Sequence, residues 1–258
     1  MKAKLFYGMV HLPALPGSPE SKYTLGEIID YAKKEVTGFK DAGLTGAILE
    51  NINDYPFYKD KIPPITVAAM AAISQEVKKI PGIEIGVNIL RNGCTEALTI
   101  ATLFDFSFIR CNVLSGAYVT DQGIIEGNGA DLLRYKKYLN SNVKIYADVH
   151  VKHSYPLYNV PIDIAAEDLS ERGGADAIIV SGSRSPVPPE VERVKAVKKV
   201  IKKPVLIGSG ISLTNFYDYV DISDGMIIGE SDFKENNISC GPSDFKAYKK
   251  LMEEYKKL

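Results

Sequence analysis

Short apolar runs alternate with amphipathic stretches eight times along the chain, and this rhythm constrains the fold more than any other feature. Read as strands and helices, the pattern gives eight strand–helix units of roughly 32 residues each in a chain of 258 residues. No linker, low-complexity segment or charge block interrupts the series. Strands that alternate with helices pair in parallel with both faces covered. We therefore predict an α/β fold, a closed (β/α)8 TIM barrel forming a single domain over 1–258. A doubly wound sheet is the alternative, but it gives no reason to stop at eight units.

The element boundaries follow from the apolar pattern and from proline and glycine punctuation. We expect strands at 5–10, 45–49, 83–87, 106–109, from 143 onward, and at 175–180, 204–207 and 225–228. We expect helices at 25–42, 63–80, 94–103, 130–139, 162–172, 191–201, 213–220 and 242–257. The stretch 115–129, which contains several glycines, is expected to be a loop.

Charge and cysteine content exclude several classes of protein. The net charge is −1 and the pI about 6.3, so no general attraction to nucleic acid or to an anionic membrane is expected. The apolar runs are far shorter than a membrane span, so no membrane insertion is expected. The cysteines Cys94, Cys111 and Cys240 are odd in number, far apart and without CxxC spacing, so we expect neither a disulfide framework nor a zinc ribbon. These features predict a reduced, cytoplasmic protein.

Polar side chains stand where the expected strands end. In a barrel all strand C-termini meet on one face, and reactions are built there. Every histidine in the chain belongs to this set or to the loop directly after it, which favours one shared site over an accidental gathering. The strand-end set is His11, Glu50, Asn88, Arg110, Asn112, Asp148, His150, Ser181, Gly208, Ser209, Gly210 and Gly229, with His153 in the following loop.

The stretch from Val143 to His153 contains three of the candidate site residues within six positions: Asp148, His150 and His153. In an extended chain, side chains at i and i+2 share a face, so Asp148 and His150 are expected side by side, with Tyr146 on the same face. A carboxylate next to an imidazole suits proton transfer or a polar ligand, because each shifts the pKa of the other. The alternative is a hydrogen-bonded pair that only holds a loop.

The sequence assigns provisional roles to the other strand ends. Asp148, Glu50, His11 and His150 are the candidate acid/base groups. For Glu50, a structural salt bridge to Arg110 is an equal alternative. Candidate substrate-binding groups are Asn88, Arg110, Asn112, His153 and Ser181, with the guanidinium suited to a carboxylate or phosphate and the asparagines to ligand hydroxyls or to bracing a loop.

Glycines at the last two strand ends suggest a phosphate site. Gly208, Ser209 and Gly210 precede a helix and Gly229 ends the final strand, the region where many barrels bind phosphate through backbone N–H groups. Glu230 argues against this, because its carboxylate would repel a phosphate unless it points outward. The same glycines could also serve tight turns alone.

No cofactor is expected, and a metal site is the less favoured interpretation. Asp148, His150, His153, His11 and Glu50 could supply a two-histidine–carboxylate set for a divalent ion, but no HxH follows the first strand. A Schiff-base lysine is not expected either. Lys152 is next to the site, but alternation turns it away from the side of His153 and His11.

With these stretches assembled, the chain resembles the BtpA/SgcQ family. The matching segments are 8–19, 50–51 with 56–57, 88–92, 108–112, 147–153 and 204–210. The resemblance implies a TIM barrel; one branch of the family is named for photosystem I biogenesis, and another stands among sugar-uptake and sugar-metabolism proteins. The chain departs from the family pattern at 181–186, where a Thr-Gly pair is expected, and at Glu230, where threonine is usual.

Together the residues and the resemblance predict an enzyme acting on a small phosphorylated sugar or ribosyl compound, as an isomerase, lyase or glycosidic-bond-cleaving enzyme. A non-catalytic assembly factor is the first alternative and would carry an exposed apolar patch away from the rim. Phosphoribosylanthranilate isomerase activity is the second; that barrel also has an Asp ending strand five, but its general base is a Cys where His11 stands here. A homodimer is compatible with either.

Overall fold

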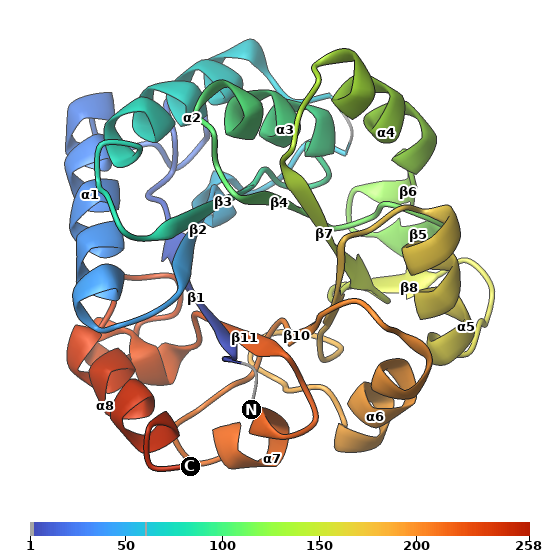
Figure 1. The fold of residues 1–258 in the computed structure, drawn as a ribbon. Helices are drawn as coiled ribbons and strands as arrows, with labels where there is room; N and C mark the ends of the chain where they lie inside the picture. Colours follow the sequence, from blue (N-terminus) through green and yellow to red (C-terminus); the bar gives the residue numbers. More distant parts are fainter. Residues whose placement is uncertain (1–2, 60) are drawn as a thin grey trace.

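The computed structural model describes residues 3–59 and 61–258, and its centre is a closed barrel of eight parallel strands (Figure 1). Each expected strand is present, and neighbours pair in the order β1, β2, β3, β4, β7, β9, β10, β11 and back to β1. The TIM-barrel prediction is therefore confirmed. The strands are β1 (Leu5–His11), β2 (Gly46–Glu50), β3 (Glu84–Asn88), β4 (Phe108–Cys111), β7 (Lys144–Val149), β9 (Ala177–Val180), β10 (Val205–Ile207) and β11 (Gly225–Ile228).

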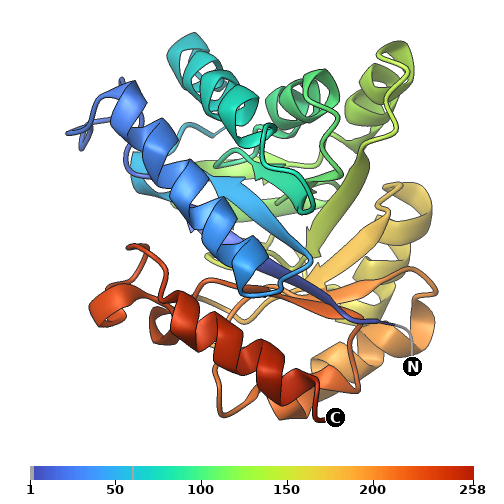
Figure 2. The same cartoon turned by 60° about the vertical axis from the view of Figure 1, so that its left-hand side comes forward.

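Helices surround the barrel and cover the outer face of its strands (Figures 1 and 2). Local sequence starts several of them: Thr24 and Glu27 form a capping box at α1, and Pro64 occupies the first turn of α2. The helices are α1 (Leu25–Asp41), α2 (Pro64–Val77), α3 (Cys94–Leu103), α4 (Gly129–Tyr138), α5 (Ile162–Glu167, continued by a π turn at Asp168–Arg172), α6 (Val191–Val200), α7 (Phe216–Val220) and α8 (Phe245–Tyr255). None of the helices within 3–59 and 61–258 is long and apolar enough to cross a membrane.

Aromatic side chains fill the barrel interior below the site. The rings of Tyr7 and Phe108 have centroids 4.8 Å apart, and Phe108 stacks on Tyr146 at 4.3 Å. The Tyr7 hydroxyl donates to Glu84 Oε2 at 2.9 Å toward the N-terminal end of the strands. Tyr146 shares the interior face with Asp148, as expected for residues two apart in a strand. The polar residues of the opposite, C-terminal end therefore lie above a packed floor.

A small antiparallel sheet stands outside the barrel where the sequence predicted a loop. It consists of β5 (Ala117–Thr120), β6 (Gly123–Glu126) and β8 (Ser154–Pro156). Tyr118 and Ile125 face inward and pack with Val113 and Val151. The prediction of a loop at 115–129 is wrong. The sequence does contain a hairpin pattern, because the apolar residues Tyr118 and Ile125 lie on either side of a short turn that ends at Gly123, whose φ is 101°.

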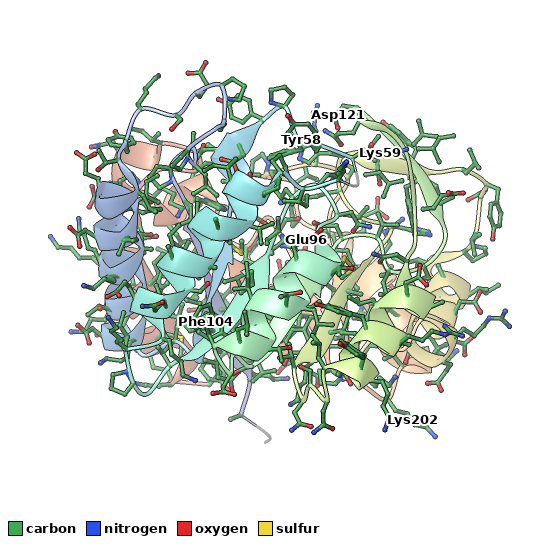
Figure 3. The ribbon with its side chains drawn as sticks, turned by 90° about the horizontal axis from the view of Figure 1, so that it is seen from above. Tyr58, Lys59, Glu96, Phe104, Asp121 and Lys202 are labelled. Atoms are coloured by element: carbon green, nitrogen blue, oxygen red, sulfur yellow. A yellow bond between two sulfur atoms is a disulfide. The ribbon has the colours of Figure 1, made fainter. Side chains whose placement is uncertain are left out.

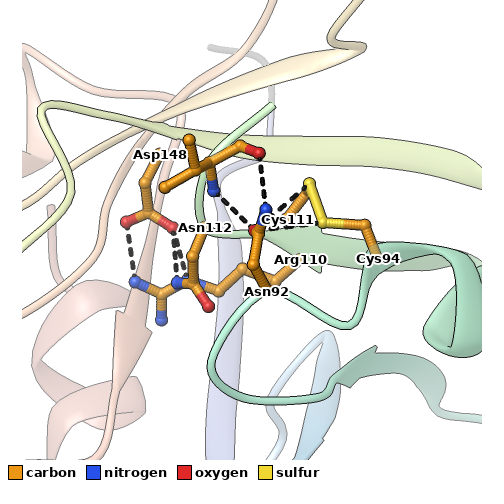
Figure 4. The surroundings of a disulfide bond; sticks show 7 residues. Asn92, Cys94, Arg110, Cys111, Asn112 and Asp148 are labelled. Atoms are coloured by element: carbon orange, nitrogen blue, oxygen red, sulfur yellow. Dashed lines mark hydrogen bonds and ion pairs between the residues drawn. A yellow bond between two sulfur atoms is a disulfide. The ribbon is translucent and has the colours of Figure 1, made fainter. Parts of the chain in front are cut away.

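A disulfide joins Cys94 at the start of α3 to Cys111 at the end of β4 (Figure 4). Their Cα atoms are 5.3 Å apart, and both side chains are buried. The side chain of Asn92 packs beside them, accepting from Val113 N at 2.8 Å and donating to Val113 O at 2.9 Å. The expectation that the cysteines remain unpaired is therefore wrong for this pair, while Cys240 is a free thiol.

Candidate active site at the barrel mouth

The C-terminal end of the barrel holds a buried ion pair between Arg110 on β4 and Asp148 on β7 (Figure 4). Arg110 donates from Nε to Asp148 Oδ2 at 2.9 Å and from Nη2 to Oδ1 at 2.8 Å, a bidentate contact. Asn112 Nδ2 donates to Oδ2 at 3.3 Å, and Ser181 Oγ donates to Oδ1 at 3.1 Å. Burial alone would lower the pKa of Arg110, but the adjacent Asp148 carboxylate raises it above its ordinary value. Both oxygens of Asp148 are thus engaged, and the guanidinium stays charged.

Glu50 on β2 lies in a separate polar group with His11 and Asn88. Its Oε1 accepts from Asn88 Nδ2 at 2.5 Å, and its Oε2 lies 3.8 Å from His11 Nε2. The expected alternative of a Glu50–Arg110 salt bridge is not what forms, because Arg110 is committed to Asp148. Glu50 therefore retains an oxygen, Oε2, with only a long contact to an imidazole.

The pKa of His11 is lowered well below its usual value, first by burial and then by the positive charges of Lys234, Lys152 and Arg110. At 3.8 Å the carboxylate of Glu50 is too far to hold a proton on His11 through a hydrogen bond. His11 is therefore a neutral imidazole near pH 7, with Nδ1 buried and free of any hydrogen-bond partner among residues 3–59 and 61–258. A neutral imidazole can accept a proton.

This state of His11 predicts a pH dependence of stability. The unfolded chain protonates His11 near pH 6.5, whereas the folded chain does so only at lower pH, so the unfolded state binds more protons in that window. The free energy of unfolding should fall below pH 6.5, with His11 contributing at most about 1.4 kcal/mol per pH unit. In His11→Asn this contribution should vanish. Urea unfolding between pH 5 and 8 measures it; Glu192→Ala, at an exposed position, is the control, and unchanged pH dependence in His11→Asn would contradict the assignment.

Glu50, Arg110 and the loops above them enclose a cavity of about 550 Å³ at the barrel mouth. Its walls include Arg91 and Lys152 together with Asn112. A deeper cavity of about 50 Å³ shares Glu50, Arg110 and Lys152, and adds His11 and Glu230. Figure 3 separates this end, where Asp121 and Tyr58 lie, from the opposite end, where Phe104 and Lys202 lie. Glu50 and His11 therefore border cavities that they share with Arg110 and Lys152.

Four buried polar atoms at this mouth have no hydrogen-bond partner in the part of the chain that the structure describes. They are His11 Nδ1, Asn88 Oδ1, Arg91 Nε and Asn112 Oδ1. Buried polar atoms are nearly always paired, since leaving one unpaired costs about 1–3 kcal/mol. Arg91 and Asn112 line the 550 Å³ cavity and His11 lines the smaller one, so three of these four residues border space that a polar ligand could fill.

Two cations of this cavity were not in the predicted site. Arg91 follows β3 and is buried, and its Nη2 donates to the Lys152 backbone oxygen at 2.7 Å. Lys152 lines both mouth cavities, and its Nζ donates to Ser185 Oγ at 2.8 Å. The prediction that alternation turns Lys152 away is wrong, because the chain is no longer extended beyond Val149: His150 and His153 have φ values of 50° and 56°.

The same departure from extended geometry separates His150 from Asp148. The ring of His150 lies outside the barrel mouth, in a cavity of about 520 Å³ with Tyr118 and Arg134, and Arg193 Nη2 stands 3.4 Å from its Nδ1. The expectation that His150 points with Asp148 is therefore wrong. His153 does reach the mouth cavity, where its Nε2 lies 3.5 Å from the Ser185 amide, although it is exposed.

The glycines expected to bind phosphate are not open to the mouth as predicted. The Gly210 amide donates to Glu230 Oε1 at 2.8 Å, so a carboxylate of the chain occupies that anion position. Ser209 is buried and accepts from the Gly182 amide at 3.2 Å. Gly208 and Gly229 line the deeper cavity, and a Cβ on Gly208 would meet Ser181 Oγ at 2.3 Å. Glu230 points inward, the orientation that opposes phosphate at Gly210.

Across residues 3–59 and 61–258, no cluster of three or more His, Cys, Asp and Glu side chains is arranged to hold a metal ion. The two-histidine–carboxylate metal site considered from the sequence does not form, because His150 faces another cavity and Asp148 is paired with Arg110.

Solved structures similar to this chain include TIM-barrel enzymes. The (S)-3-O-geranylgeranylglyceryl phosphate synthase of Thermoplasma acidophilum, in complex with sn-glycerol-1-phosphate, matches with a TM-score of 0.61 and 14% identity, covering 100% of this chain and 95% of that one. Phosphoribosyl anthranilate isomerase of Thermus thermophilus matches with a TM-score of 0.55 and 11% identity, covering 98% of each chain. At these identities the similarity shows the fold alone.

Sequence relatives are much more similar. An uncharacterized protein of Methanocaldococcus jannaschii is 41% identical over 239 residues, which cover 92% of this chain and 90% of that protein. The photosystem I biogenesis protein BtpA of Synechocystis is 40% identical over 233 residues, 90% of this chain and 81% of that one. The model of the BtpA family matches residues 2–257. Because that match spans nearly the whole sequence, the chain belongs to the BtpA family.

Proposed function

We propose that this protein is an enzyme that acts on a small phosphorylated sugar or ribosyl compound by acid/base chemistry at the barrel mouth. The observation that carries the proposal is that three residues with an unpaired, buried polar atom line the two mouth cavities. Arg91 and Asn112 line the larger cavity and His11 the smaller one, and both cavities also contain Glu50, Arg110 and Lys152. Such a surface is costly to keep in a protein unless a ligand satisfies it. Relatives in fold act on phosphorylated compounds, which is consistent with this substrate class.

Glu50 and His11 are the proposed proton-transfer groups. Glu50 has an oxygen free of short contacts, and His11 is neutral, so each can accept a proton and return it. Asp148, expected from the sequence to share this role, is proposed instead to orient Arg110, since both its oxygens already accept hydrogen bonds. Isomerisation, carbon–carbon cleavage and glycosidic-bond cleavage can all use one such pair, without a metal or cofactor.

The ligand would be bound by polar groups that make fewer hydrogen bonds within the protein than they are able to make. The Oδ1 atoms of Asn88 and Asn112 can accept from sugar hydroxyls. Arg91 supplies positive charge for a phosphate, and the glycines near Gly210 could add amides only if Glu230 moved away. His153 would contact the ligand from the cavity's outer edge, and Ser181 would act through Asp148.

A two-step experiment tests the proposal. Thermal unfolding is followed with a panel of phosphorylated sugars and ribosyl compounds, including phosphoribosylanthranilate, which also tests the isomerase alternative. Ligands at 100 times their Kd should stabilise the fold by about 2.7 kcal/mol. Any turnover of a stabilising compound should fall about 10²–10⁴-fold in Glu50→Gln, because the amide keeps the shape and loses the base.

Glu192→Gln, at an exposed position of α6 outside the cavity, is the matched control for Glu50→Gln and should keep most of the turnover. Stabilisation retained in Glu50→Gln together with lost turnover would identify a catalytic role. Full turnover in Glu50→Gln would contradict the assignment of Glu50, and the absence of stabilisation by every compound would contradict the substrate class.

A non-catalytic assembly role is the second candidate, favoured by one surface feature. Ile124, Val119 and Tyr155 face one another across β6, β5 and β8, and are 47%, 42% and 79% exposed. This apolar row adjoins the mouth, since Tyr155 also lines its cavity, and so lies nearer the rim than the patch expected from the sequence. If the row binds a second copy or another protein, Val119→Lys should abolish the association and leave thermal stability unchanged. A monomeric wild-type chain with no captured partner would remove this candidate.

A further inference from the structure

We infer that Lys152 is an amine nucleophile that forms a Schiff base with the carbonyl carbon of a small phosphorylated ketone or aldehyde in the barrel mouth. This inference rests on the proposed function and goes beyond it, because it adds a covalent intermediate and restricts the substrate to compounds with a carbonyl group. It also assigns a use to a lysine of the mouth cavities that the acid/base proposal leaves without a role.

The position of Lys152 makes its amine reachable from the ligand space. Its side chain lines both the 550 Å³ cavity and the 50 Å³ cavity, in each case together with Glu50 and Arg110. The hydrogen bond from Arg91 Nη2 to the Lys152 backbone oxygen, at 2.7 Å, holds the backbone that carries it. The amine is thus presented to bound molecules from a fixed loop.

The charge environment favours a neutral amine. The ion pairs of residues 3–59 and 61–258 do not include Lys152, whose Nζ donates to the neutral Ser185 hydroxyl. Burial and then the Arg110 charge lower the pKa of Lys152, although Glu50 and Glu230 oppose the shift. A desolvated lysine beside other cations is the arrangement that activates an amine for attack on a carbonyl.

Lys234 provides an internal comparison. It is buried near the barrel, and its Nζ donates to Met9 O at 3.3 Å and Ser243 Oγ at 3.2 Å. It lines neither of the two mouth cavities. Both amines donate only to neutral oxygens, but of these two lysines Lys152 alone has access to the ligand space.

The covalent step balances with groups at the site. The lone pair of the neutral amine attacks the carbonyl carbon, a C–N bond forms, and the carbonyl π electrons move to oxygen, which takes up a proton. The nitrogen then loses a proton to the neutral His11 imidazole or to Glu50, and the hydroxyl leaves as water after protonation. The iminium ion that results can accept the electrons released by proton loss or bond cleavage at the adjacent carbon. No oxidant or reductant is needed.

Reductive trapping tests the inference. The full chain is incubated with dihydroxyacetone phosphate or ribose 5-phosphate, treated with sodium borohydride, and analysed by intact mass and peptide mapping. We expect one reduced adduct per chain, located on Lys152, and at least tenfold less adduct with unphosphorylated dihydroxyacetone. Lys152→Met should lose the adduct, whereas Lys195→Met, which removes an exposed lysine of α6, should keep it. Peptide mapping of the wild-type chain decides the site even if Lys152→Met folds poorly.

Adducts spread over exposed lysines, or equal labelling in a folded Lys152→Met, would overturn the inference. Thermal stabilisation by the two phosphorylated probes without any trapped adduct would also overturn it, while leaving the proposed function standing. If the whole panel, including these two probes, produced neither stabilisation nor an adduct, both proposals would fall.

Discussion

Asp148→Ala is expected to lower the free energy of unfolding by about 3–5 kcal/mol, because it leaves a buried guanidinium without its partner. The side chains of Arg110 and Asp148 are 2% and 0% exposed, so water cannot replace the lost carboxylate. The donors of Asn112 and Ser181 lose their acceptor as well. Urea unfolding followed by circular dichroism measures the change.

Glu192→Ala is the control for this loss, since Glu192 pairs with Lys195 on the surface and its side chain is 81% exposed. It should change stability by no more than about 0.5 kcal/mol. A double variant with Arg110→Met and Asp148→Leu should be less destabilised than the sum of its single changes, because no charge remains buried. If Asp148→Ala costs as little as Glu192→Ala, the pair does not anchor the barrel mouth.

Removing the disulfide by Cys94→Ala with Cys111→Ala is expected to cost about 3 kcal/mol, since the bond closes a loop with a sequence separation of 17 residues. Cys111 stands between Arg110 and Asn112, so the loss should also loosen the contacts to Asp148. Thermal unfolding with and without dithiothreitol measures the effect, and the wild-type chain in reductant should approach the double variant.

Cys240→Ala serves as the matched control, because Cys240 is a free thiol and its removal should leave the redox dependence intact. Thiol counting before unfolding must accompany the measurement. Three titratable thiols in the unreduced chain, or identical unfolding curves in both conditions, would contradict the pairing of Cys94 with Cys111.

The barrel could be predicted from the sequence because apolar periodicity and glycine or proline punctuation are local signals, and eight repeats leave few topologies. The gathering of Glu50, Arg110 and Asp148 at one end followed from that topology. The partner of Arg110 could not be predicted, because it depends on how β4 and β7 are aligned. In the structure Arg110 pairs with Tyr146, so Asp148 lies just beyond the last paired residues of these two strands.

The errors arose where the chain leaves regular geometry. Alternation was extended past Val149, although His150 and His153 adopt positive φ values that rotate their side chains. That single assumption placed His150 in the site and removed Lys152 from it. The Cys94–Cys111 pairing was missed because the cysteines were judged by motif spacing, yet both lie at element ends that the predicted barrel brings to the same face.

Because the Gly210 amide donates a hydrogen bond to Glu230, the Glu230 carboxylate competes with any bound anion for that amide. A group on the same chain competes at an effective concentration on the order of millimolar, which no dilution of the protein reduces. Binding at the Gly210 amide therefore requires displacement of Glu230. A phosphate can accept from this amide only after the Glu230 side chain has moved away, whereas a neutral compound leaves the hydrogen bond to Glu230 intact.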